Sequence, residues 1–245
     1  MVVVTSSPSS IRVRKRPEER REEILSHAAA IALDEGLERI TLRAVAERLG
    51  VRPGLITHYF PAAEDLVIEA FARAAVLERE QFFPTAGSPI ERLAHFIGRV
   101  QGGASTGLAR LWLNARHLSR FSPALEAELQ EQDRLDRERL IAIIEDGRSS
   151  GDFPAGDAET ACTRILIAVD GGGAYVNSDA EVPHPGQAHA VADITDWALG
   201  LPAGTVQGAI DLLPATTALE GVRDESPALI RTEPSPRRPQ SLRIT

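Results

Sequence analysis

The apolar positions of residues 41–60, TLRAVAERLGVRPGLITHYF, repeat with the spacing of two short helices joined by a tight turn. In the first helix they recur every three or four residues: Leu42, Val45, Ala46 and Leu49. Thr41 can cap that helix, Gly50 can end it, and Pro53 suits the first position of a second helix. The pattern predicts a helix-turn-helix, a DNA-reading unit; an ordinary helical corner of an all-α protein is the alternative.

The second predicted helix has one side that would pack and one side that would face outward. Its expected contacts with the first helix are Ile56, Tyr59 and Phe60. The predicted DNA contacts of the whole segment are Thr41, Arg43, Arg52, Gly54, Leu55, Thr57, His58 and Tyr59. Of the two arginines, we expect Arg52 to read a base.

Charge is divided unevenly along the chain. Residues 1–60 contain ten Arg or Lys and eight Asp or Glu, a balance of +2, whereas the remainder contains 17 against 27, a balance of −10. A duplex repels a uniformly acidic protein, so a basic head on an acidic body would let one end bind phosphates. The charge distribution therefore favours the DNA-binding interpretation.

The segment and its flanks resemble the tetracycline-repressor (TetR) family of transcription regulators. The residues that carry the resemblance are Ala30, Ile31, Leu33, Gly36, Leu37, Ile40, Thr41, Leu42, Val45, Ala46, Leu49, Gly50, Val51, Gly54, Ile56, Tyr59, Phe60, Glu64 and Leu66. Residues 54–60 are most similar to the betaine-regulator (BetI-like) branch, and a second similarity extends over residues 108–197. The resemblance implies a homodimeric repressor that binds a double-stranded DNA operator and responds to a small-molecule effector.

Two positions depart from the family pattern. Arg52 stands where the family often has a Ser or Thr that caps the second helix, and Ala63 stands where it often has Lys. Arginine supplies charge in place of a cap. Loss of the lysine removes an expected phosphate contact, which leaves open an all-helical sensor or interaction module that does not bind DNA specifically.

From residue 17 onward the apolar spacing predicts an all-α fold of about nine helices. After the helix-turn-helix, these are expected at residues 62–81, 88–102, 106–119, 122–150, 157–177 and 185–199, with one more helical turn near 206–213. The expected domains are a disordered basic arm (1–16), a three-helix DNA-binding head (17–62), a helical-bundle body for ligand binding and dimerisation (63–201) and a mostly disordered tail (202–245). The arm is either merely solvated or adds DNA contacts.

The last two predicted helices carry an apolar face that we interpret as the dimer interface. Its residues are Ile165, Ile167, Ala168, Gly171, Gly172, Gly173, Tyr175, Val191, Ile194 and Trp197. Glycine costs ~1 kcal/mol relative to alanine inside a helix, so three in succession favour a close approach between helices. A helix break at residues 171–173 is the alternative.

A pocket for the effector is expected inside the helical body. The candidate ligand contacts are Phe96, Trp112, Asn114, Arg116 and His117, with Arg120 and Phe121 beside them. Each of these could instead be an ordinary core or surface residue. Trp112 is the strongest candidate because a large ring lines a pocket well and its indole can donate a hydrogen bond.

The composition argues against several other classes of protein. Cys162 is the single cysteine, which excludes an internal disulfide and leaves either a core residue or a redox sensor. The histidines lack the spacing of a metalloprotease; His184 and His189 near Glu181 are the weak alternative of a metal-dependent enzyme. We expect no metal, no cofactor and no catalysis. No apolar run approaches the ~18 residues of a membrane span, so we expect a cytoplasmic protein without membrane contact.

Overall fold

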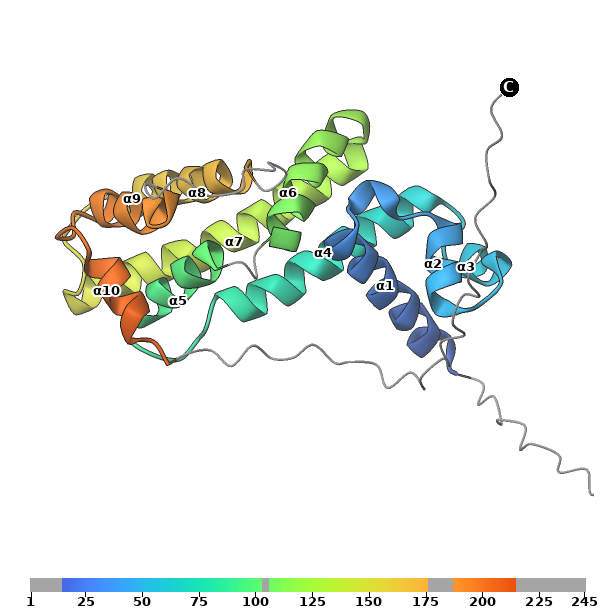
Figure 1. The fold of residues 1–245 in the computed structure, drawn as a ribbon, viewed down its shortest axis with the longest axis horizontal. Coiled ribbons are helices and arrows are strands. Elements are labelled where there is room, and N and C mark those ends of the chain that lie inside the picture. Colours follow the sequence, from blue (N-terminus) through green and yellow to red (C-terminus); the bar gives the residue numbers. More distant parts are fainter. Residues whose placement is uncertain (1–14, 103–105, 176–186, 215–245) are drawn as a thin grey trace, which may run out of the picture. The chain divides into compact units, whose positions relative to one another are not determined.

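Helix α1 (Pro17–Asp34) braces the N-terminal helices in the computed structural model, which describes residues 15–102, 106–175 and 187–214 (Figure 1). Pro17 occupies the first turn, and Glu19 accepts a hydrogen bond from the backbone N–H of Arg16 at 3.1 Å, so the helix start is satisfied. Its apolar stripe, which includes Ile24 and Ile31, is buried. The short 3₁₀ helix η1 (Leu37–Arg39) follows after a left-handed glycine, Gly36.

Helices α2 (Leu42–Leu49) and α3 (Pro53–Tyr59) form the expected helix-turn-helix. The hydroxyl oxygen of Thr41 accepts a hydrogen bond from the backbone N–H of Ala44 at 3.0 Å. Gly50 ends α2 at φ 64, a conformation that glycine adopts at little cost. Ile56 and Phe60 are buried, as the apolar spacing predicted.

Helix α4 (Ala63–Phe82) joins these N-terminal helices to the rest of the chain, and it packs along both α1 and α7. Two ion pairs tie it to α1. Arg21 donates to both carboxylate oxygens of Glu69 at 2.5 Å, and Arg73 pairs with Glu22. The Arg21 guanidinium also lies 4.8 Å from the centre of the Phe60 ring, so α1, the end of α3 and α4 meet at one contact.

The remaining described elements are all helical: α5 (Pro89–Gln101), α6 (Thr106–Leu118), the 3₁₀ helix η3 (Ser119–Phe121), α7 (Pro123–Ser150), α8 (Ala158–Gly173), α9 (Ala190–Leu199) and α10 (Thr205–Leu212). Helix α7 packs against α4, α5, α6 and α8, while α8 and α9 lie side by side (Figure 1). Helix α6 reaches back to α1: a Cβ on Gly107 would lie 2.8 Å from the backbone oxygen of Leu33. Only a glycine allows that approach.

Three predicted boundaries differ from the structure. Helix α8 ends at Gly173, short of the expected residue 177. Helix α9 begins at Ala190, later than the expected residue 185, and residues 187–189 before it form turns. Residues 176–186 lie outside the described part. The start of the disordered tail was predicted too early, at residue 202, because residues Thr205–Leu212 form helix α10. Asp196 accepts hydrogen bonds from the backbone N–H groups of Gly204 and Val206 at 2.7 and 3.0 Å, which anchors α10.

Helix α10 brings the α-helices of the described residues to ten, one more than the expected nine. It packs on α5 and α9 with Val206 buried. The described residues up to Leu213 form one compact unit, so the division at residue 62 into head and body stays a prediction. Residues 1–14 of the predicted arm and residues 215–245 of the predicted tail lie outside the described residues.

Candidate nucleic-acid interface and cavity

Helix α3 presents an exposed polar face without a carboxylate. Gly54, Thr57 and His58 are exposed, whereas Leu55 and Tyr59 are half-buried. The Thr57 hydroxyl donates to the backbone oxygen of Pro53 at 3.3 Å, and the His58 ring meets the Tyr59 ring edge-to-face with centres 5.2 Å apart. This face can therefore approach a polyanion without repulsion from its own helix.

The predicted arginines differ in their surroundings. Arg52 is the N-cap residue of α3, and its side chain makes no capping hydrogen bond and no ion pair with any described residue. Arg43 is on α2, where its Nε donates to Glu47 Oε1 at 2.8 Å on an exposed surface. Exposed pairs of this kind are weak, so both guanidinium groups remain available to phosphate. Thr41 acts first as the cap of α2.

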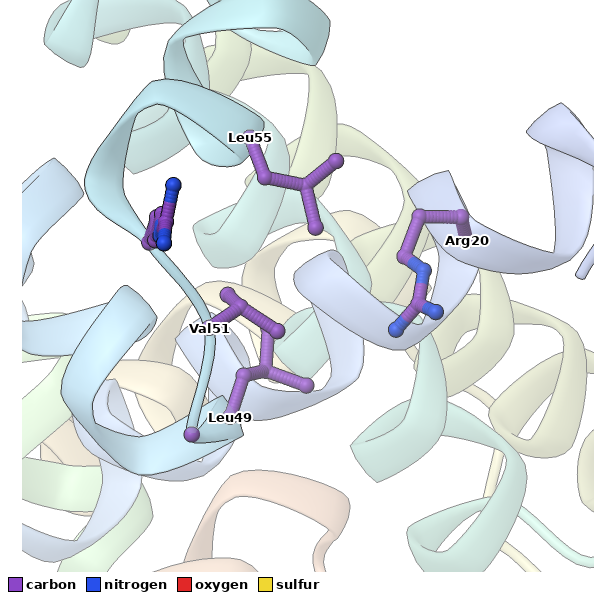
Figure 2. A pocket seen from close by; sticks show the side chains of 6 residues that line it. Arg20, Leu49, Val51 and Leu55 are labelled. Atoms are coloured by element: carbon purple, nitrogen blue, oxygen red, sulfur yellow. The ribbon is translucent and has the colours of Figure 1, made fainter. Parts of the chain in front are cut away.

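A depression between α1 and the α2–α3 turn adds a residue that the sequence analysis missed. Arg20 of α1 faces Val51 and Leu55 across it (Figure 2). Gly50, Leu49 and Arg52 complete the lining. Arg20 lies 21 positions before the start of the motif, in a segment with more glutamate than arginine, so no local signal indicated it.

A larger cavity of about 1480 Å³ lies among α4, α5, α6, α7, α8 and α9. Its aromatic lining consists of Phe82, Phe83, Phe96, Trp112, Tyr175 and Trp197, with the Phe83 and Phe96 rings stacked 4.7 Å apart. Pockets that hold organic ligands are typically apolar and contain a few well-placed polar groups. This cavity has that character.

The polar part of the lining centres on α4 and α7. The Arg79 Nε donates to Asp136 Oδ1 at 2.5 Å, and its Nη2 donates to the Gln132 side-chain oxygen at 2.7 Å. Burial raises the pKa of Asp136 to about 6 despite the arginine. Trp112 Nε1 donates to Glu78 Oε2 at 3.0 Å, and burial raises the pKa of Glu78 to about 8.

Three of the five candidate ligand contacts line the cavity, and two do not. Phe96, Trp112 and Arg116 line the cavity, and Arg116 donates to Asp133 at 3.2 Å and to Asp170 at 2.9 Å. Asn114 and His117 do not line it, which corrects that part of the prediction.

The physical reason is the helical period. Trp112 and Arg116 are four residues apart on α6 and share a face of the helix, whereas Asn114 is two residues from each and lies on a different face. Asn114 instead donates a hydrogen bond to Glu38 of η1, and His117 is exposed beside Phe121. Asn114 therefore connects the wall of the cavity to the N-terminal helices.

The predicted dimer face also separates into two sides. Ile165 and Val191 are buried, 0% and 7% exposed, so they belong to the core beneath α8 and α9 and are not available to a partner. The exposed apolar side chains are Ile167 (66%), Tyr175 (64%), Ile194 (37%) and Trp197 (65%). Gly172 is exposed and Ala168 is half-buried beside them. This surface, Ile167, Tyr175, Ile194 and Trp197, is called the α8–α9 face, and all four of its residues also line the cavity.

The remaining candidates have simple structural roles. Cys162 is buried and burial raises its pKa to about 11, which supports a core residue over a redox sensor. His189 contacts the Gln207 side-chain oxygen at 2.8 Å, and His184 and Glu181 lie outside the described residues. Within the described ranges no group of three His, Cys, Asp or Glu could hold a metal ion. None of the described helices is long and apolar enough to cross a membrane.

A helix-turn-helix with an open second helix, carried on a helical bundle, is typical of DNA-binding transcription regulators. Residues 24–70 match the family model of bacterial regulatory proteins, tetR family. Residues 24–70 therefore contain the region that this family model describes, and the relatives that match the chain are transcriptional repressors.

Two relatives in Mycolicibacterium smegmatis are HTH-type transcriptional repressors. KstR2 is 26% identical over 142 residues, which cover 56% of this chain and 69% of the relative. KstR is 36% identical over 87 residues, which cover 34% of this chain and 42% of the relative. A transcriptional regulator from Saccharomonospora viridis in complex with choline has the same fold, with a TM-score of 0.62 and 21% identity over 74% of this chain and 95% of that one.

Proposed function

We propose that this chain is a homodimeric repressor that binds a palindromic operator and releases it when a small molecule occupies the cavity. The observation that carries the proposal is the open, carboxylate-free face of α3 with the unpaired Arg52 at its start. A recognition helix in the major groove reads bases with its N-terminal residues. The eight predicted DNA contacts remain a proposal on this basis, and Arg20 joins them as a candidate phosphate contact.

The two arginines are expected to differ in the kind of DNA contact that they make. Changing Arg52→Ala should relax the preference at one operator position and cost ~1–3 kcal/mol, because a base contact is lost. Changing Arg43→Ala should weaken binding to all DNA sequences equally, because a phosphate contact is lost. It should also reduce the slope of log affinity against log salt concentration by about one. Binding-site selection and footprinting at several salt concentrations measure both effects.

Arg134→Ala is the matched control for these variants, because Arg134 is an exposed arginine of α7 whose ion pairs are with Glu131 and Glu138. It should leave both the salt slope and the base preference unchanged. If the Arg52 variant keeps the base preference of the original protein, α3 does not read DNA through this residue. If no operator is protected at all, the protein is instead the helical sensor that Ala63 favours.

Dimerisation through the α8–α9 face would give the two-fold symmetry that two half-sites require. Four large apolar side chains in one exposed patch are unusual on a monomer, and this patch continues the pairing of α8 with α9. A second copy of the same chain presents the same face, so an isologous contact covers all four at once. Half-sites would then lie about one helical turn of DNA, ~34 Å, apart.

Two helices connect the cavity with the N-terminal helices. Helix α4 contributes Glu78, Arg79 and Phe82 to the lining and packs along α1. Helix α6 contributes Trp112 and touches α1 and η1 through Gly107 and Asn114. A ligand that favours one arrangement of α4 and α6 would change the spacing of the recognition helices, but only by its difference in affinity for the two states.

Trp112 is expected to separate ligand response from DNA binding. Its ring packs edge-to-face on Phe71 at 5.4 Å and its indole donates to Glu78, so Trp112→Phe keeps an aromatic ring and removes the donor. The variant should bind operator within about 2-fold of the original protein and lose at least ~10-fold in effector sensitivity, because the part-buried hydrogen bond that holds Glu78 in the cavity lining is lost. Operator release is titrated by fluorescence anisotropy.

Trp112→Ala extends this test, because it also removes the ring that packs on Phe71. Loss of operator binding in the phenylalanine variant would make Trp112 a structural residue and would place the effector elsewhere. The structural neighbour binds choline, and at 21% identity that ligand is not transferred to this chain.

A further inference from the structure

The carboxyl group of Glu78 is the one acidic group of the cavity lining for which no ion pair exists among the described residues. Asp136 pairs with Arg79, while Asp133 and Asp170 pair with Arg116. Among the residues that the structure describes, Glu78 accepts only the indole hydrogen bond of Trp112, at 3.0 Å. A desolvated carboxyl group without a cation is costly in its charged form, so this position can accept a positive partner.

The charged groups around Glu78 come from three helices, and the cations among them already have other partners. Arg79 of α4 is paired with Asp136 and Gln132. Arg99 of α5 donates to Gln81 at 2.9 Å and lies 5.1 Å from the centre of the Phe82 ring. Asp136 of α7 adds a negative charge nearby, while Trp112 of α6 supplies a neutral donor.

We propose that the effector is a hydrophobic organic cation whose ammonium group binds against Glu78, with its apolar body along Phe82, Phe96 and Trp112. This assignment rests on the proposed function of the cavity as the effector site. Aromatic faces attract ammonium groups, and a carboxylate completes such a site. A cavity of about 1480 Å³ has room for a substantial apolar body as well as the charged group.

An anionic ligand fits the lining less well. Of the arginines that line the cavity, Arg79, Arg116 and Arg137 are each paired with a carboxylate. Arg164 lies 4.5 Å from the centre of the Trp197 ring, on the proposed dimer face. An anion would have to displace one of these pairs or bind at that edge, whereas a cation meets an unpaired carboxyl group.

Cation binding should be linked to the release of a proton. Because the pKa of Glu78 is about 8, the empty site is mostly protonated at pH 7. An ammonium ion favours the charged carboxylate and lowers that pKa, so the proton passes to the buffer. Affinity for a cation should therefore rise with pH up to about 8 and then level off, while affinity for a neutral ligand should not.

The test uses three probes with the same body and different charge: 4-phenylbutyltrimethylammonium, 4-phenylbutan-1-ol and 4-phenylbutyrate. Binding to the full-length protein is measured by titration calorimetry between pH 6 and 9, in buffers of different ionisation enthalpy. The quaternary ammonium has no proton to lose, so any proton released comes from the protein. We expect it to bind at least ~10-fold more tightly than the alcohol at pH 8, with close to one proton released at pH 7.

Glu78→Gln mimics the protonated acid and keeps an acceptor for Trp112. It should abolish the proton release and the preference for the cation, while changing affinity for the alcohol by less than ~2-fold. Glu80→Gln is the matched control, because Glu80 is an exposed glutamate of the same helix whose partner is Arg139, and it should change neither. Tighter binding of the carboxylate, affinity that does not depend on charge, or no binding of the ammonium would overturn the proposal.

This experiment contains no DNA, so its outcome is independent of operator recognition. A protein that footprints an operator but prefers the carboxylate probe would keep the proposed regulatory function and lose only the ligand class. A protein that binds the ammonium through Glu78 but protects no operator would keep the ligand class and lose the proposed function.

Discussion

Changing Ile167 and Trp197 together to glutamate is expected to turn the proposed dimer into a monomer and to lower operator affinity at least ~100-fold, because each monomer retains only one half-site's contacts. Both side chains are about two-thirds exposed in the single chain, at 66% and 65%. In an isologous contact each new carboxylate would be buried near its copy in the partner, where like charges and lost solvation both oppose association.

The fold of the variant should survive, because the core beneath the α8–α9 face is formed by other residues, among them Cys162, Ile165 and Val191. Light scattering measures the mass, circular dichroism the helix content, and footprinting the operator affinity. Leu212→Glu is the control: Leu212 is 87% exposed on α10, and the same change there should leave all three unchanged. A variant that remains a dimer would move the interface away from this face.

Changing Arg79→Met is expected to lower the free energy of unfolding by ~3–5 kcal/mol, because it leaves one partner of a buried ion pair without its cation. The Arg79 side chain is only 7% exposed and donates to Asp136 and Gln132. Methionine keeps much of the apolar volume, so the loss reports the missing charge and hydrogen bonds more than a cavity.

This loss should depend on pH in a defined direction. The pKa of Asp136 is raised to about 6 by burial, and Arg79 lowers it, so removing Arg79 raises it further. An acid whose folded pKa lies above its unfolded value destabilises the fold as pH rises through that range. The deficit of the variant should therefore be larger at pH 8 than at pH 5. Urea unfolding at one fixed protein concentration measures it.

The double variant Arg79→Met with Asp136→Leu provides the control for this prediction. Replacing both members of a buried ion pair with apolar residues is often close to neutral, so most of the lost stability and its pH dependence should return. A deficit equal at both pH values, or one that the second change does not repair, would show that Arg79 acts through packing alone.

Local signals were sufficient for the helix-turn-helix. A capping threonine, a left-handed glycine and a proline at the start of α3 each act within a few residues, so Thr41, Gly50 and Pro53 could be identified without any tertiary information. The all-helical class followed from the apolar period in the same way. The BetI-like branch remains a prediction, as do the DNA contacts themselves.

The face of a helix on which a residue lies was harder to predict from the sequence than the helix itself. The types of the five candidate ligand residues suit a pocket, but the direction of each side chain depends on how its helix is rotated against its neighbours. The same limit affected the dimer face, where Ile165 points into the core and Ile167, two residues later, points out. A helix with apolar residues on both sides does not reveal which side meets the chain's own core.

The amino-acid sequence by itself determined the helix-turn-helix and the helical class, because both rest on interactions between residues close together in the chain. Only the tertiary structure brought Trp112 to Glu78, 34 residues apart, and Arg79 to Asp136, 57 residues apart. It also decided that Asp196 holds α10 in the fold. Such contacts depend on the packing of whole helices, which is set by the combined fit of many side chains and leaves no signal at a fixed spacing.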